Sequence, residues 1–63
     1  MIRIARIGDK VSDDIGNDGI IDSISGDKVQ IDRYESWTIP ERCVGVRFRD
    51  GWHIVSMRLL HRA

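Results

Sequence analysis

Residues that could perform covalent chemistry are few in this chain. Cys43 and His53 form the one conceivable pair of nucleophile and general base. If a tight turn at Asp50-Gly51 joins two strands, alternation directs Cys43 outward and His53 inward, at opposite ends of the hairpin. The two groups should therefore not meet. Because no paired carboxylates are placed for acid–base catalysis either, we expect no enzymatic activity.

The acidic segment at residues 14–19 carries part of the pattern of a calcium-binding loop. However, Gly16 occupies a ligand position, and Ser25 stands where a bidentate glutamate is needed. One cysteine and two histidines without a recognisable spacing are too few ligands for zinc. We therefore expect a structural turn here, with no metal and no cofactor in the protein.

Arginine and tryptophan side chains near the C-terminal end suit binding better than catalysis. Two guanidinium groups beside an indole can pair with phosphates or carboxylates and can stack on bases. The residues expected to form this face are Arg47, Arg49, Trp52 and Ile54, and those that could widen it are Arg42, Arg58, His61 and Arg62. The alternative is a charged face that protects a sheet edge, with Trp52 packed under the N-terminal strand or a neighbouring subunit.

The charge of the chain is zero overall but unevenly distributed. Ten Lys and Arg balance ten Asp and Glu. Residues 1–40 carry a net charge of −3 and residues 41–63 a net charge of +3. Any basic patch must therefore come from the C-terminal third. The neutral total argues against strong non-specific DNA binding, which normally needs a surplus of positive charge.

The elements that would position this face are predicted to be strands. Isoleucine and valine alternate with polar residues between breaks rich in glycine and aspartate. The expected strands cover residues 2–7, 10–12, 19–25, 28–34, 43–49 and 52–57. Gly26-Asp27 and Asp50-Gly51 are predicted two-residue turns, while residues 35–42, with Pro40, form a longer connection. Arg58-Leu59-Leu60 could form one helical turn.

The turns also predict a register. With Asp50-Gly51 as the loop, Arg49 lies opposite Trp52 and Val46 opposite Val55. The core face of this hairpin then consists of Val44, Val46, Phe48, Val55 and Met57. In the preceding hairpin Ile24 pairs with Val29, and one extra residue near Asp22-Ser23 restores the alternation. Such a bulge bends a strand as a small closed barrel requires.

These features predict an all-β, single-domain protein over residues 1–63: a small SH3-like barrel of five to six short antiparallel strands with a terminal helical turn. Gly8-Asp9-Lys10-Val11 followed by Gly16-Asn17-Asp18-Gly19-Ile20-Ile21 resembles the opening of SH3-like barrels of the KOW type. The later Val44-x-Val46-x-Phe48-x-Asp50-Gly51 is similar to their closing hairpin. Members of this group that contact RNA usually carry basic residues around the first loop, where this chain has Asp13, Asp14 and Asp18.

Two further aromatic residues, Tyr34 and Trp37, lie near the end of a predicted strand and in the following connection. With Trp52 they could line an aromatic recess, as in Tudor-like barrels that hold methylated lysine or arginine. The alternative is that these rings simply cover a small core.

The functional expectation is a non-enzymatic adaptor of bacterial or phage and mobile-element type that engages nucleic acid through the Arg/Trp face. The first alternative is a protein–protein module, for example an inhibitor of a host protein. The second is a structural homo-oligomer in which a strand with Ile2 and Ile4 pairs edge to edge. No apolar run approaches the roughly 20 residues of a membrane span, and a lone cysteine is typical of a reducing compartment. We therefore expect a cytoplasmic protein without membrane contact.

Overall fold

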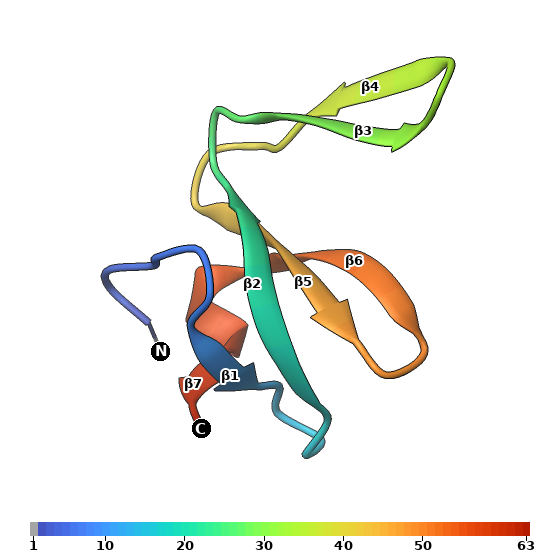
Figure 1. The fold of residues 1–63 in the computed structure, drawn as a ribbon. Coiled ribbons are helices and arrows are strands. Elements are labelled where there is room, and N and C mark those ends of the chain that lie inside the picture. The colour runs from blue at the N-terminus through green and yellow to red at the C-terminus, as the bar shows by residue number, and fades with distance from the viewer. Residues whose placement is uncertain (1) are drawn as a thin grey trace.

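The computed structural model describes residues 2–63, and these residues form an all-β structure (Figure 1). The elements are β1 (Lys10–Ser12), β2 (Asp18–Ile24), β3 (Lys28–Asp32), β4 (Glu35–Thr38), β5 (Cys43–Phe48), β6 (Gly51–Ser56), the 3₁₀ turn η1 (Met57–Leu59) and β7 (His61–Arg62). The all-β prediction is confirmed. The helical turn predicted at Arg58-Leu59-Leu60 takes the form of η1, one residue earlier.

The strands form two separate antiparallel sheets. The larger has the order β6-β5-β2-β1-β7, and the smaller consists of β3 and β4 alone. In the large sheet β6 and β7 are the two edges, so its hydrogen bonding is open and does not close into a barrel. The β3–β4 hairpin projects away from the large sheet (Figure 1).

The core lies against one face of the large sheet. Its fully buried side chains are Val11, Ile21, Ile39, Val44, Val46 and Leu60. The predicted bulge is confirmed, because the pairing of β2 with β5 shifts between Ile21 and Ser23. Ile21 thus lies opposite Val46, and Asp22 is left as the extra residue. Because of the bulge, Ile21 and Ile24 both face the core, and the Asp22 carboxylate stays outside it.

The register of the β5–β6 hairpin differs from the prediction by two residues. Phe48 pairs with Gly51 and Val46 with His53, so the turn consists of Arg49-Asp50. Gly51 has a φ of 138°, a conformation that glycine adopts easily, and it follows the turn instead of lying within it. Because a shift of two residues preserves alternation, the predicted face assignment survives the wrong register.

The N-terminal segment is not a strand, contrary to the prediction for residues 2–7. The lateral partners of β1 are already β2 and β7, so the segment has no place beside that strand. Ile2 is instead buried at 3% exposure, while Ile4 and Ile7 are 65% and 63% exposed. The edge strand proposed for self-association through Ile2 and Ile4 is therefore absent from residues 2–63.

The middle of the chain corrects a second prediction. The reversal after β2 is at Ser25-Gly26, where Asp27 N–H donates to the Ile24 carbonyl at 3.0 Å, and β3 does not pair with β2. Val29 lies opposite Trp37, not Ile24, which pairs with Val44. Residues 35–38, predicted as a connection, are strand β4, because they pair locally with β3.

Candidate binding face

The exposed face of the large sheet carries a row of side chains that crosses four strands. Lys10 pairs with Ile20, Ile20 with Arg47, and Arg47 with Trp52. Directly opposed residues project to the same side of a sheet, so the row alternates cation, apolar group, cation and indole. Ile20 is 46% exposed. These four residues, with Asp22 beside them, are called the Arg47–Trp52 face below.

Trp52 lies flat across β5, and Gly45 makes this possible. A Cβ atom at Gly45 would lie 2.6–2.8 Å from three atoms of the indole, which is too close for any side chain. The indole Nε1–H then donates to Asp22 Oδ1 at 2.7 Å, on the far side of β5. Trp52 is therefore half-buried and fixed in orientation rather than free in solvent.

Asp22 also contacts Arg47, whose Nη2 lies 3.4 Å from Oδ2. One carboxylate from the β2 bulge thus contacts both the indole and the guanidinium. The Arg47 side chain is 68% exposed, and an exposed pair of this kind contributes about 0–1 kcal/mol. Arg47 consequently keeps its capacity to contact a ligand while its position is restricted.

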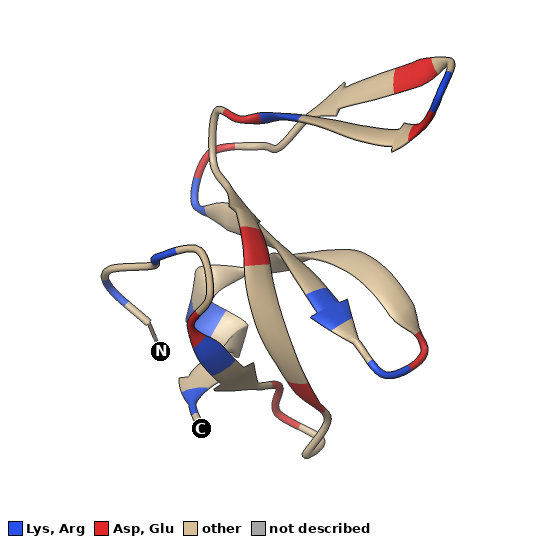
Figure 2. Ribbon diagram, in the orientation of Figure 1, with Lys and Arg blue, Asp and Glu red and all other residues tan. Residues whose placement is uncertain are grey.

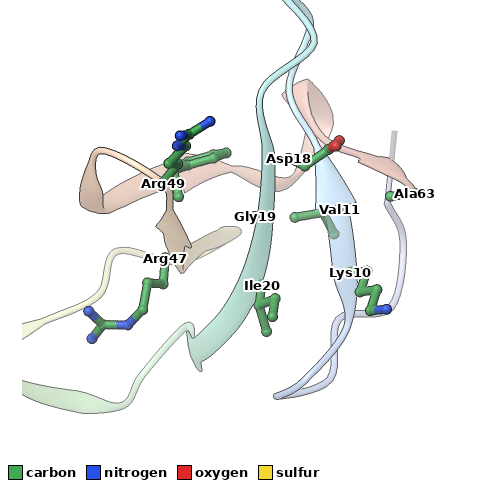
Figure 3. Close-up of a pocket in the computed structure, with 9 residues that line it drawn as sticks. Lys10, Val11, Asp18, Gly19, Ile20, Arg47, Arg49 and Ala63 are labelled. Carbon is green, nitrogen blue, oxygen red and sulfur yellow. The ribbon is translucent and has the colours of Figure 1, made fainter.

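Arg49 does not share this face. It lies in the turn between β5 and β6, and its guanidinium points away from that of Arg47 (Figure 3). The predicted juxtaposition of the two guanidiniums is therefore wrong, because the turn begins one residue earlier than expected. Ile54 does lie on the same side of β6 as Trp52, opposite Gly45, and is half-buried.

A shallow recess of about 440 Å³ adjoins the face, between β1, β2 and β5 (Figure 3). Lys10, Ile20 and Arg47 line it, together with Asp18 and Arg49. Ile20 lies between the two cationic side chains of the row (Figure 3). This recess could accept an anionic group beside an apolar one, although Asp18 reduces its positive charge.

Sequence reasoning missed Lys10, Ile20 and Asp22 as members of this face. The available signal was the alternation of β1 and β2: Val11 and Ile21 are core residues, so Lys10 and Ile20 must face outward. Asp22 was recognised at the bulge but was not connected with Trp52, since that contact depends on the pairing of β2 with β5.

Arg42 and Arg58, predicted to widen the positive surface, lie elsewhere. Both line a different recess of about 540 Å³, together with Arg3 from the N-terminal segment. The structure thus separates Arg47 from Arg42 and Arg58, and Arg49 lies in neither the row nor the second recess. His61 and Arg62 are also elsewhere: His61 Nε2 lies 2.8 Å from Asp14 Oδ1, and Arg62 Nη1 lies 3.3 Å from Asp9 Oδ2.

Tyr34 and Trp37 are in the β3–β4 hairpin, at exposures of 86% and 51%. They do not meet Trp52 in one recess: across residues 2–63 the one ring pair is Phe48 with His53, with centroids 5.9 Å apart. A small recess of about 160 Å³ connects the hairpin with Trp52, but Val29, Gln30 and Ile31 line it on the hairpin side.

The groups considered for catalysis and metal binding stay apart. Cys43 pairs with Ser56 at one end of the β5–β6 hairpin, while His53 Nε2 lies 3.4 Å from Asp50 Oδ1 near the other. In the described part of the chain, no three His, Cys, Asp or Glu residues group as a metal site would require.

The loop between β1 and β2 is held by Asp13. Its carboxylate accepts the Asn17 side-chain amide at 2.9 Å and the backbone N–H groups of Asn17 and Ile15 at 2.8 and 3.0 Å. These donors, the Asn17 side chain first, lower the pKa of Asp13 below its usual value of 3.8. The acidic loop is thus ordered by its own hydrogen bonds and by a contact of Asp14 Oδ1 with His61 Nε2 at 2.8 Å.

In comparisons with protein families, curated proteins and solved structures, nothing matches this chain. Within residues 2–63, no helix has the length and apolar character needed to cross a bilayer.

Proposed function

We propose that this chain is a non-enzymatic binding module built as an SH3-like barrel of the KOW type. The support is the strand order β6-β5-β2-β1-β7 with a 3₁₀ turn before the last strand. In SH3-like barrels five strands follow this order, and a single 3₁₀ turn precedes the final one. The bend of β2 at the Asp22 bulge lets one strand serve two halves of such a barrel.

The proposed ligand of the Arg47–Trp52 face is nucleic acid. The observation that carries this proposal is the cross-strand row Lys10–Ile20–Arg47–Trp52. The two cations suit adjacent phosphates, and an indole held flat on the sheet suits stacking against a base. Two neutralised phosphates give a slope of log K against log salt of only about −1.4 for a single strand. The proposed binding is therefore weak and confined to low salt.

Fluorescence anisotropy of a labelled single-stranded 12-mer tests this proposal, measured between low and moderate salt. Lys10→Ala with Arg47→Ala should remove most of the binding and flatten the salt dependence. Arg33→Ala, in the turn of the β3–β4 hairpin, is the matched control and should bind as the unmodified chain does. No binding at low salt, or equal binding by all three proteins, contradicts the proposal.

A protein partner, including a second copy of this chain, is the second candidate. The observation in its favour is the β3–β4 hairpin, which exposes Ile31 at 48% and Trp37 at 51% and buries none of its residues. Isolated two-stranded hairpins are marginally stable in water, and exposed apolar groups often mark interaction sites. Light scattering across a range of concentrations tests self-association. A constant monomer mass eliminates the second copy as the partner.

A further inference from the structure

A recess lined by three arginines lies apart from the Arg47–Trp52 face. Its volume is about 540 Å³, and its walls come from the N-terminal segment, the turn before β5 and the start of η1. The residues that line this arginine recess are Ile2, Arg3, Arg42, Ser56, Met57 and Arg58. Over residues 2–63, no carboxylate lies within ion-pair distance of these arginines. Basic segments are visible on the N-terminal segment and on η1 in Figure 2.

Backbone hydrogen bonds fix the walls of the arginine recess relative to one another. Met57 N–H donates to the Arg42 carbonyl at 3.0 Å, and Ile2 N–H donates to the Met57 carbonyl at 3.1 Å. Met57 therefore joins the turn before β5 to the N-terminal segment. Ile2 belongs to the buried core and Met57 packs against it. The arginines consequently extend from backbone positions that the folded core determines.

Arg42 has an unfavourable backbone conformation. Its φ is 61°, and among residues 2–63 it is the one non-glycine residue with a positive φ. Cys43 N–H donates to the Pro40 carbonyl at 3.1 Å, so Arg42 is the third residue of a tight turn. With a positive φ, that position favours glycine or asparagine. Arg42 thus occupies a position that glycine would fit better, and such strained residues cluster at ligand-binding sites.

We propose that the arginine recess binds the phosphate group of a nucleotide-sized phosphate monoester. Guanidinium groups bind phosphate oxygens through paired hydrogen bonds, and a phosphate monoester offers three oxygens and nearly two negative charges. Ile2 and Met57 supply an apolar surface against which a sugar or base can pack. The volume falls within the range of about 300–1,000 Å³ that is typical of small-molecule sites.

Two sources present this chemistry: a free nucleotide and the terminal phosphate of a nucleic-acid strand. We would titrate the protein with AMP, with adenosine and with a matched pair of hexanucleotides that end in a 5′-phosphate or a 5′-hydroxyl. AMP should shift the backbone amide resonances of Met57 and Arg58, whereas adenosine should not. A tenfold preference for the 5′-phosphorylated strand identifies the strand end, and equal affinity of both strands identifies the free nucleotide. No AMP-dependent shift together with no 5′-phosphate preference overturns the proposal.

Arg42→Gly separates a ligand-binding role from a structural one. Because glycine relieves the positive φ, the urea midpoint should rise, while the affinity for AMP should fall about tenfold through loss of charge-assisted hydrogen bonds. Unchanged AMP affinity contradicts a ligand-binding role of Arg42, and a lowered urea midpoint contradicts the unfavourable backbone conformation of this residue.

Arg58→Gln is the second variant, and it should weaken AMP binding by a similar factor without raising the midpoint. Arg33→Gln is the control and should leave AMP binding unchanged, because Arg33 lies in the turn of the β3–β4 hairpin and does not line the arginine recess. The amide shifts of Met57 and Arg58 report on the arginine recess, which the Arg47–Trp52 face does not line, so the two proposals can fail separately.

Discussion

The large sheet and the β3–β4 hairpin are both antiparallel, yet they are stabilised in different ways. The sheet covers a core in which Val11, Ile21, Val44, Val46 and Leu60 are fully buried. The hairpin has no buried residue, and its Ile31 and Trp37 remain about half exposed. Cross-strand pairs, which contribute roughly 0.2–1 kcal/mol each, support it together with the half-buried Val29, which lines the small recess shared with Trp52.

This difference shows that apolar residues with the same alternation can have different consequences. In the sheet they lower the free energy of the folded monomer. In the hairpin they add little to its stability, and the second candidate function assigns them to contact with a partner. The hairpin should also open locally at a much lower free energy than the sheet.

The largest expected effect compares one isoleucine from each region. Ile21→Ala, in the core, should lower the free energy of unfolding by about 3 kcal/mol through lost burial and a residual cavity. Ile31→Ala, in the hairpin, should change it by less than about 0.5 kcal/mol. A domain of this size has a total stability of roughly 3–9 kcal/mol, so this loss removes between about a third and all of it.

Urea unfolding followed by circular dichroism measures both variants. The distinction between the regions fails if the two substitutions cost similar free energies. If Ile31→Ala also lowers any self-association of the chain, the exposed isoleucine contributes to contact between chains and the buried one to the stability of the monomer.

A smaller loss is expected at the packing of Trp52 on the sheet. Gly45→Ala places a methyl group within 2.6–2.8 Å of the indole, so the ring has to move away from Asp22. The free energy of unfolding should fall by about 2 kcal/mol, typical of overpacking. Gly26→Ala is not a suitable control, because Gly26 has a positive φ of 90°.

Fluorescence of Trp52, in a Trp37→Phe background, measures this change as a red shift on exposure of the ring. Ser36→Ala in β4 of the hairpin is the control, and it should alter neither the emission nor the stability. An unshifted spectrum in Gly45→Ala would mean that the indole repacks around the new methyl group and keeps its hydrogen bond to Asp22. That result contradicts the expected overpacking of the large sheet at this position.

Replacing the hairpin itself should have a smaller effect still. Asp27 and Ile39 are joined by a hydrogen bond of 3.2 Å from Ile39 N–H to the Asp27 carbonyl. Residues 28–38 can therefore be exchanged for Asn-Gly, a preferred two-residue turn, while the buried Ile39 is kept. The stability should stay within about 1 kcal/mol, since shortening a loop costs little and no core residue is lost.

Thermal unfolding of this shortened chain checks the expectation. A loss of several kcal/mol in the free energy of unfolding would mean that the hairpin stabilises the large sheet, and the two regions would then not be independent in stability. If the shortened chain is stable and any self-association has disappeared, the hairpin is assigned to partner contact.

The sequence was sufficient to predict the features that depend on local patterns. The all-β class and the bulge at Asp22 follow from alternation and from one position where alternation breaks. Which strands pair was not predictable in the same way. By alternation alone, Val29 could pair with Ile24 or with Trp37. In the structure it pairs with Trp37, because β5 already occupies the edge of β2.

The candidate site was less predictable than the fold for a related reason. A face is set by alternation, so Arg47, Trp52 and Ile54 were placed together correctly. Arg49 was misplaced because the turn begins one residue earlier than predicted: the register shift of two residues leaves the strand faces intact but moves Arg49 from the strand into the turn. The contact of Trp52 with Asp22 joins residues thirty positions apart, and no local pattern indicates it.

The smallest expected effect concerns the loop between β1 and β2, which resembles the hairpin in having local hydrogen bonds as its main support. Because the Asn17 side chain is the largest cause of the lowered pKa of Asp13, Asn17→Ala should raise that pKa toward 3.8. A carboxyl group with a lowered pKa in the folded state stabilises the fold at pH above the unfolded value. This contribution is lost as the pH falls through the folded pKa, hence below about pH 4.

Titration of the Asp13 carboxyl carbon by NMR, with and without Asn17→Ala, measures the change directly. Asp32→Ala is the matched variant in the hairpin, where that carboxylate accepts Tyr34 N–H at 2.7 Å. It should loosen the hairpin tip and leave the titration of Asp13 as it was, since within residues 2–63 no hydrogen bond or ion pair joins the two turns. A change in the Asp13 pKa upon Asp32→Ala would show that the hairpin and the large sheet are coupled, and it would contradict the independent stability of these two regions.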